Sequence, residues 1–350
     1  MSIRECQPQW LAFIDEHKPK SSVAKVFCMV SKTGLTAFHG GIIMTRPAAM
    51  KKQAQYLFPA GAKFASNNLV LHASARRHVV AGFAGPLSIK SVLVGEVDWI
   101  VDGRPLRVDP TTFLVLNDGQ TYSMDIDSIR PVETCCVFFQ TGFVETVARD
   151  ATTPLDRSLE SPFGGPAPGV EFLSRLHSDG SLAILPQMWS LAGRCSQGLQ
   201  PSNFEEDFLI LSEKLLMLQR EIRSQISRIP AAKPSTRNEL FRRLQIAREY
   251  LHSNLHHRIS LEEVSREACI SRYHLHRAFT QVFRSTPHVY LTKIRMERAR
   301  SLLQAGHSVL ETMLALGIAS PSAFRRLFRA HYGVPPSAHS KISKIGPVTR

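Results

Sequence analysis

The chain has 350 residues, a hydrophobic content of 43% and a formal net charge of +14 at pH 7. This length allows two domains, and the composition excludes a wholly disordered or collagen-like chain. No uncharged apolar run is long enough to span a membrane, and residues 1–20 lack the apolar core of a secretory signal. We therefore expect a cytoplasmic protein with no membrane partner.

The six cysteines favour a reduced, intracellular protein. They include no Cys-x-x-Cys pair, and a chain of this length can build a core without disulfides. Cys135 and Cys136 lie in the apolar run 135–139, which predicts a buried strand. No cysteine pair accompanies the histidines at zinc-finger spacing, so we expect neither a metal nor a cofactor.

Residues 25–139 carry the patterns of short strands. Residues 87–94 begin with alternating polarity, and Asp102-Gly103 is a strong hairpin signal. Further turns are expected at 109–111 and 117–119. Many short antiparallel strands predict a small barrel, and the pattern over about residues 40–140 resembles a cupin-like sensor domain.

The mouth of such a barrel can hold a small ligand. The candidate effector-binding residues are His72, His78, Trp99 and Tyr122. For each of them, a place in the packed core or on the surface is the alternative. The segment lacks the His-x-His of metal-dependent cupin enzymes, which disfavours a metal enzyme.

Helices are predicted after the barrel. A loop is expected over 157–169, followed by helices from about Glu171, over 182–192, and from 203 to about 228. Apolar residues of the last helix follow a heptad spacing. Its predicted dimerisation residues are Leu211, Leu215, Leu218 and Ile222. Packing of this helix on its own barrel is the alternative.

The basic charge is concentrated in the last third of the chain. From Arg237 onward, 19 Lys and Arg accompany 7 Asp and Glu, whereas residues 1–236 contain 24 and 22. The stretch 230–236 contains two prolines and predicts an interdomain linker. A basic domain behind a near-neutral one suggests an anionic polymer as partner, with a merely solvated basic face as the alternative.

This basic third contains an internal repeat. Four positions of the first copy, Leu275, Phe279, Phe283 and Pro287, recur 49 residues later as Phe324, Phe328, Tyr332 and Pro336. A capping box begins a short helix in each copy, formed by Ser260 with Glu263 in the first and by Ser308 with Glu311 in the second. A tight turn and a second helix follow. The repeat therefore predicts two helix-turn-helix units.

These motifs resemble the AraC/XylS family of transcription regulators. The resemblance rests on residues 260–279, 295–303, 317–328 and 333–336, over about a hundred residues. It implies that bases are read by Arg272, Tyr273, His276, Arg277, Ser322, Arg325 and Arg326. The predicted phosphate contacts are Ser271, Thr280, Arg284 and Arg329.

The sequence departs from the family pattern at several positions. Cys269 and Arg284 stand where the family usually has glycine, and Ser265 where it has alanine. In the second unit, Thr312 and Met313 replace an Ile-Ala pair. A connecting helix over 288–304 would be about 25 Å long, so the two recognition helices could enter successive major grooves about 34 Å apart.

The predicted fold class is α+β with two domains. Residues 1–229 would form the cupin-like barrel with its helical dimerisation element, and 237–342 an all-α double helix-turn-helix domain. We expect a transcription regulator that binds double-stranded DNA in its major groove, responds to a small-molecule effector, forms a homodimer, contacts RNA polymerase and associates with the nucleoid when bound to DNA.

Two other functions compete with this prediction. A constitutive DNA-binding regulator would use the barrel only for dimerisation. A DNA-repair methyltransferase would need a Pro-Cys-His-Arg motif, and no cysteine here has those neighbours. We therefore expect no enzyme.

Overall fold

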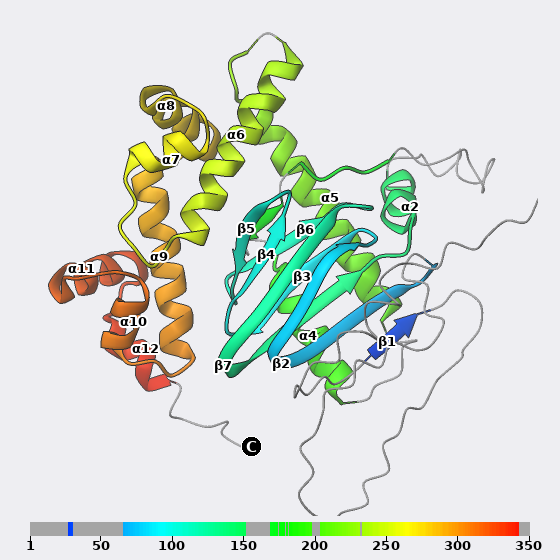
Figure 1. The fold of residues 1–350 in the computed structure, drawn as a ribbon, viewed down its shortest axis with the longest axis horizontal. Helices are drawn as coiled ribbons and strands as arrows, with labels where there is room; N and C mark the ends of the chain where they lie inside the picture. Colours follow the sequence, from blue (N-terminus) through cyan, green and yellow to red (C-terminus); the bar gives the residue numbers. More distant parts are fainter. Residues whose placement is uncertain are drawn as a thin grey trace, which may run out of the picture. The chain divides into compact units, whose positions relative to one another are not determined.

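The protein divides into two compact units, Met1–Leu216 and Met217–Arg350. The computed structural model describes residues 27–30, 66–151, 169–173, 175–178, 180, 182–197, 204–231 and 233–342. The first unit holds an antiparallel sheet and the second is helical (Figure 1). The α+β class predicted from the sequence is confirmed.

The first unit is built on an eight-stranded antiparallel sheet that curves into a nearly closed barrel. Its strands follow the order β1-β2-β7-β3-β6-β8, and β4 pairs with β5 and β7. Their bounds are β1 Phe27–Val30, β2 Asn68–Ala84, β3 Ser88–Val94, β4 Val97–Val101, β5 Arg104–Val108, β6 Thr112–Leu116, β7 Thr121–Phe138 and β8 Leu176–Ser178.

The long strands β2 and β7 pair along most of their length. They pair from Leu69 with Phe138 to Ala84 with Thr121, and the register shifts twice along the way. Such irregularities bend a strand and increase its twist. The first half of β7 also pairs with β4, and its second half with β3. One face of the curved sheet therefore encloses an apolar core around Trp99.

Local turn chemistry sets the hairpins, as predicted. Asp102 and Gly103 both have positive φ, 50° and 73°, which is the backbone of the two-residue turn that suits twisted strands. At the next turn, the Asp109 carboxylate accepts a hydrogen bond from the Thr111 amide at 2.7 Å. The predicted loop over 157–168 and barrel residues before 66, β1 apart, lie outside the described residues.

In the described residues, three helices belong wholly or partly to the first unit: α2 Phe143–Asp150, α4 Ile184–Ser196 and α5 Glu205–Ser227. Helix α4 packs against β2, β3 and β7. The helix expected from about Glu171 is absent from the described part of that segment, where residues 176–178 instead form β8 and pair with β6. That prediction was wrong because pairing with a distant strand overrides local preference.

The heptad seam of α5 faces the protein's own core. Leu211 and Leu215 are fully buried, and Ile222 is 3% exposed. Leu218 packs against the core of the second unit, to which Ile222 belongs. The predicted seam is therefore covered within the single chain: Leu211, Leu215 and Ile222 are buried and Leu218 is partly buried, and dimerisation through these residues stays a prediction. The alternative of intramolecular packing fits the structure.

In its described residues, the second compact unit contains helices joined by turns and short loops. Its helices are α6 Pro234–Ser253, α7 Leu261–Glu267, α8 Arg272–Phe283, α9 Pro287–Gln304, α10 Val309–Ala315, α11 Pro321–Tyr332 and α12 Pro336–Ile342. Apolar residues from α6 to α11 share one buried cluster, joined by Ile222, Ile226 and Ile229. Helix α6 begins at Pro234, inside the stretch expected to be a linker.

Candidate nucleic-acid interface and barrel cavity

The first helix-turn-helix unit begins with the predicted capping box. The Glu263 amide donates to Ser260 Oγ at 3.2 Å, and the Ser260 amide donates to Glu263 Oε2 at 2.6 Å. These hydrogen bonds with Ser260 lower the pKa of Glu263 below its usual value, because they favour the carboxylate. Helix α7 therefore starts at a fixed residue and carries Val264 into the core.

The turn after α7 positions the first recognition helix, α8. Cys269 adopts a left-handed φ of 53°, and its carbonyl accepts a hydrogen bond from Arg243 Nη1 at 2.8 Å. Ser271 then caps α8 by accepting from the His274 amide. Leu275 and Phe279 are fully buried on one face of α8. The opposite face is exposed, and the predicted base-reading residues Arg272, Tyr273, His276 and Arg277 all lie there.

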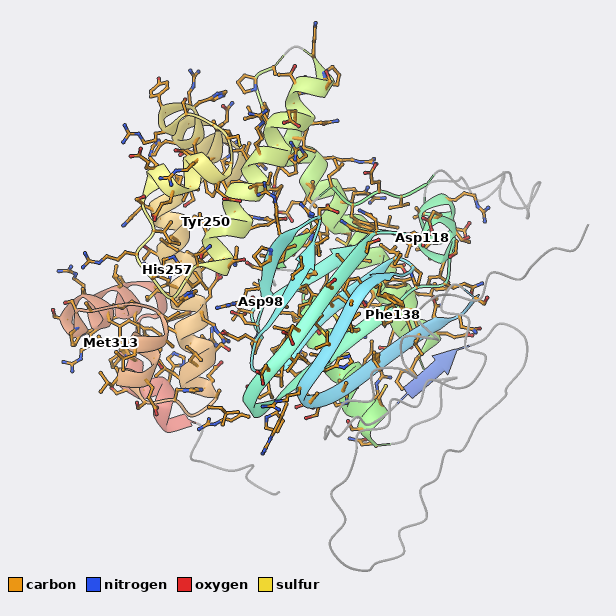
Figure 2. The ribbon with its side chains drawn as sticks, in the orientation of Figure 1. Asp98, Asp118, Phe138, Tyr250, His257 and Met313 are labelled. Atoms are coloured by element: carbon orange, nitrogen blue, oxygen red, sulfur yellow. The ribbon has the colours of Figure 1, made fainter. Side chains whose placement is uncertain are left out.

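The second helix-turn-helix unit repeats this construction. Ser308 and Glu311 form the second predicted capping box, with hydrogen bonds of 3.1 and 2.7 Å. Gly317 makes the turn at φ 61°. Helix α11 buries Phe324 and Phe328, and it exposes the predicted base-reading residues Ser322, Arg325 and Arg326. Side chains ending in nitrogen extend from this helix into solvent (Figure 2).

Gly317 is required by a close approach between backbone segments. A Cβ atom at this position would lie 2.3 Å from the carbonyl oxygen of His256. That distance is far below van der Waals contact, and the obstacle is backbone, which cannot rotate away. The segment before α7 therefore packs directly against the turn of the second helix-turn-helix unit.

Thr312 shows how the second helix-turn-helix unit accommodates a departure from the family pattern. This residue is fully buried, yet its hydroxyl donates to the Ser308 carbonyl at 2.9 Å. A buried hydroxyl with a partner carries little of the desolvation cost that an unpaired one would. The polar substitution therefore leaves α10 intact.

Helix α9 lies in the chain between the two recognition helices, α8 and α11. It has 18 residues and begins at Pro287, one residue before the predicted start. At 1.5 Å per residue, its length is about 27 Å, which is of the order of one turn of DNA. Arg295 on α9 donates to the carbonyls of Leu255 and His257 and ties the rod to the segment before α7. Sequence reasoning gave no role to this arginine.

The electrostatics of the exposed faces favour an anionic partner. In the described residues, no ion pair or hydrogen bond involves the side chains of Arg277, Arg325, Arg326 or Arg329. Arg272 lies 3.4 Å from Glu262, but both side chains are about two-thirds exposed, so this pair is weak and screened by salt. Four guanidinium groups thus remain open to phosphates or base edges.

The predicted phosphate-contacting residues differ in availability. Arg284 and Arg329 are exposed, and Arg284 ends α8 in a left-handed conformation with φ 56°. The Thr280 hydroxyl instead donates to the His276 carbonyl at 2.7 Å. Ser271 Oγ already accepts the hydrogen bond that caps α8. Of the four, the two arginines are the better-placed groups.

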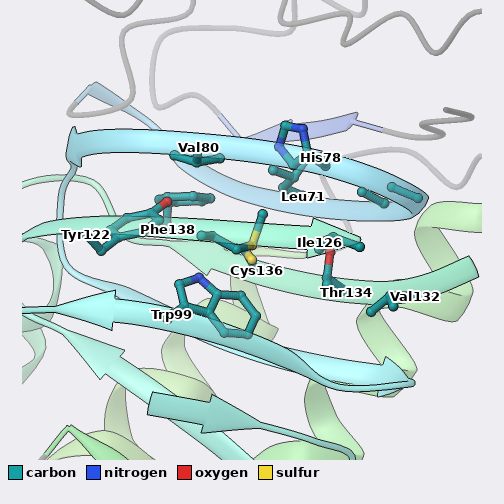
Figure 3. Close-up of a pocket in the computed structure, with 13 residues that line it drawn as sticks. Leu71, His78, Val80, Trp99, Tyr122, Ile126, Val132, Thr134, Cys136 and Phe138 are labelled. Carbon is teal, nitrogen blue, oxygen red and sulfur yellow. The ribbon is translucent and has the colours of Figure 1, made fainter. Parts of the chain in front are cut away.

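A cavity lies inside the barrel of the first unit, between β2, β4 and β7 (Figure 3). Three of the four predicted effector-binding residues, His78, Trp99 and Tyr122, line it. Burial lowers the pKa of His78 to about 4, so its imidazole is neutral at pH 7. The rest of the lining is mainly apolar, and the cavity volume is about 50 Å³.

His72, the fourth predicted residue, does not line this cavity. Its Nε2 lies 2.7 Å from Glu133 Oε1, and its Nδ1 lies 3.1 Å from Ser196 Oγ. The cause is the strand period of two: Leu71 and Ala73, its neighbours, point into the cavity and His72 points away. His72 therefore fastens the end of α4 to the sheet.

This Ser-His-Glu group is not arranged for nucleophilic catalysis. Ser196 is the last residue of α4, and its hydroxyl donates to the Ala192 carbonyl at 2.9 Å. A helix end of this kind presents carbonyl oxygens, whereas acyl transfer needs N–H donors around the developing oxyanion. The group therefore gives no support to an enzyme.

Metal-binding clusters and membrane-spanning helices are both absent from the described residues. No group of three or more His, Cys, Asp or Glu side chains there could hold a metal ion. Within the same residues, no helix combines the length and apolar character needed to cross a membrane.

Comparison with known proteins identifies the helical unit. Residues 264–341 match the family model of a helix-turn-helix domain. The transcriptional regulators ArgR and GbdR of Pseudomonas aeruginosa are 30% and 31% identical over 87 and 97 residues, which is 25% and 27% of this chain and 26% of each relative. The match thus spans about a quarter of these curated relatives.

A solved transcriptional regulator from Chromobacterium violaceum, of the type with AraC-type DNA-binding domains, is 26% identical. The alignment covers 30% of this chain and 95% of that one, with a TM-score of 0.28. Together with the motifs on α7 to α12, the family match shows that the C-terminal helices form a helix-turn-helix domain of the AraC type.

Proposed function

We propose that this protein is a sequence-specific DNA-binding transcription regulator. The observation that carries the proposal is the pair of recognition helices, each capped, each packed on one core, and each exposing at least one arginine without an ionic partner in the described residues. The names of its curated relatives, which are transcriptional regulators, support it. So does the concentration of positive charge after Arg237.

In this proposal, α8 and α11 enter successive major grooves on one face of the duplex. Arg272, Tyr273, His276 and Arg277 read bases in the first groove, and Ser322, Arg325 and Arg326 in the second. Arginine forms bidentate hydrogen bonds with guanine edges, while Arg284 and Arg329 contact phosphates. One protomer therefore covers two groove segments.

The barrel is proposed to hold a small-molecule effector. Its cavity is mainly apolar and is lined by three candidate residues, as ligand sites commonly are. Binding can regulate DNA recognition only if the ligand prefers one arrangement of the two domains. We keep the domain limits 1–229 and 237–342, with 230–236 between them, as part of this proposal.

A constitutive regulator with an inert barrel is the second candidate. The volume of about 50 Å³ favours it, because that space holds a few water molecules or a slender group and no bulky ligand. A panel of metabolites that leaves the melting temperature of the full chain unchanged would support this candidate, since a ligand of the folded state raises stability by mass action.

Further partners belong to the same proposal. A regulator that binds the genome would act in the cytoplasm, at the nucleoid, and would influence RNA polymerase. A homodimer through α5 stays part of the proposal, and Leu209 and Met217 are about half exposed on that helix.

Genome-wide mapping of DNA bound by the full chain tests the proposed function. We expect discrete sites that share a motif, confirmed by gel shift against random competitor DNA. The Arg242→Ala variant is a matched control, because it removes an exposed arginine that pairs with Glu239 on α6. Equal retention of mapped and random duplexes by the wild-type chain would contradict the proposal.

A further inference from the structure

One side chain within the barrel carries a charge that no anion in the described residues neutralises. Lys90 on β3 is completely buried. Its Nζ has no hydrogen-bond partner in the described part of the chain. Burying an ammonium ion without a partner is strongly unfavourable, and an apolar residue of similar size would stabilise the fold more. A costly group of this kind suggests a functional reason for its presence.

The strand register turns Lys90 toward the interior of the barrel. Lys90 is opposite Cys136 of β7, and Cys136 is opposite Leu71 of β2. Residues paired in this way point to the same face of a sheet. Both Cys136 and Leu71 line the cavity. Lys90 therefore extends from the same face as the cavity lining.

The ammonium group lies against two rings that form one end of the cavity. Lys90 Nζ is 3.5 Å from the ring centroid of Phe138 and 4.8 Å from that of Tyr122. Figure 3 shows these two rings side by side, next to Cys136. These two rings thus stand between the Lys90 ammonium group and the cavity. The Lys90 side chain has four flexible carbons, which lets the ammonium group reach the cavity.

The surroundings compensate the charge only in part. The two ring faces attract the cation, but burial still lowers the pKa of Lys90 to about 8, so the amine remains mainly protonated at pH 7. Burial also raises the pKa values of Cys136 and Tyr122. Both groups are therefore neutral at pH 7 and supply no negative charge.

We propose that Lys90 anchors the carboxylate of an acidic effector whose apolar body occupies the barrel cavity. This inference rests on the proposed function, of which it names the ligand class. A single ammonium ion suits a singly charged anion. Neutral His78 adds no second positive charge, and apolar residues such as Val80 and Met124 suit a hydrocarbon body. The small volume limits that body to a slender chain or one ring.

Binding of simple carboxylates to the full chain tests this inference. The probes are hexanoate and benzoate, compared with 1-hexanol, benzyl alcohol and hexylamine, which have similar bodies without the negative charge. Trp99 lines the cavity and is 1% exposed. The sequence has three tryptophans, so replacing Trp10 and Trp189 by phenylalanine leaves the emission of Trp99 as a reporter at the site itself.

We expect at least one carboxylate to shift Trp99 emission and to bind at least tenfold more tightly than its alcohol. Lys90→Met should weaken carboxylate binding about 10- to 100-fold, because a charge-assisted hydrogen bond is lost. It should leave alcohol binding unchanged. The same variant should melt at a higher temperature without ligand, since an uncompensated charge is gone. Lys293→Met, which removes an exposed lysine from α9, should change neither property.

Three results would overturn the inference: no carboxylate binds, carboxylate and alcohol bind equally, or Lys90→Met retains the preference for the carboxylate. Gel shift on the same preparation separates this from the proposed function. A chain that binds its DNA site but no carboxylate loses only the inference. A chain that binds carboxylate through Lys90 but prefers no duplex loses only the proposed regulator.

Discussion

The two helix-turn-helix units have the same construction but reach their turns with different residues. In the first unit, Cys269 and Arg284 adopt left-handed φ values of 53° and 56°. The second unit places Gly317 and Gly333 at the corresponding turn and helix end. A side chain in this conformation costs about 1–2 kcal/mol relative to the usual one. The first unit therefore tolerates strain, whereas the second has glycine at both positions.

Gly317 and Gly333 are favoured for different physical reasons. At Gly333 nothing lies within 4 Å of an added Cβ, so only the conformation favours glycine there. At Gly317, an added Cβ would lie 2.3 Å from the His256 carbonyl oxygen. The conformation and the space both require glycine at that turn, which joins the second unit to the segment before α7.

Gly317→Ala is expected to have the largest effect on stability. It should lower the free energy of unfolding by about 2–4 kcal/mol, because the backbone must shift as well as accept strain. Gly333→Ala is the control and should cost about 1 kcal/mol, because alanine must adopt the left-handed conformation there. Urea unfolding followed by helical circular dichroism measures both. Equal losses would mean that the contact with His256 does not constrain the turn.

Arg277→Ala and Arg326→Ala probe the two recognition helices separately. Each should weaken binding to a mapped site by about 1–3 kcal/mol and relax the preference at one base position. The two positions should lie in different halves of the site. Gel shift with a set of single-base site variants measures this. Unchanged binding by Arg326→Ala would mean that the second unit reads no base through this residue.

Arg329→Ala should act on phosphate contact alone. It should weaken binding to all duplexes alike and reduce the slope of log affinity against log salt by about 1, because one counterion fewer is released. Binding measured across a range of salt concentrations tests this. An unaltered slope would remove Arg329 from the interface.

Cys269→Gly is expected to have the smallest effect of these substitutions. It should stabilise the first helix-turn-helix unit. We expect a gain of about 0.5–1 kcal/mol, because relief of the left-handed strain exceeds the added flexibility of the unfolded chain. Cys269→Ser keeps the strain and should give no gain. Loss of stability in the glycine variant would show that the cysteine side chain makes a favourable contact that outweighs its conformation.

Local signals predicted the helix-turn-helix units well. Ser260, Glu263, Ser308 and Glu311 form both capping boxes, and Asp102-Gly103 forms its hairpin. Each of these features depends on residues three or fewer positions apart. The sequence therefore determines them without knowledge of the tertiary fold.

Features that depend on distant partners were missed. The heptad spacing of α5 could not distinguish a second copy from the protein's own core, which covers Leu211 and Leu215. The alternating polarity at the start of residues 87–94 does not show that both faces of this strand, including Lys90, are buried. In the structure, residues 88–92 are buried on both faces of β3, because the barrel interior lies on one side and α4 packs on the other.

In the proposed complex, α8 and α11 enter consecutive major grooves. Guanine methylation interference on a mapped site with the full chain tests it most directly. We predict two clusters of interference about one helical turn, or 10–10.5 base pairs, apart on the same face of the duplex. Arg277→Ala should remove contacts in one cluster and Arg326→Ala in the other. A single cluster, or two clusters that both variants weaken equally, would contradict the account.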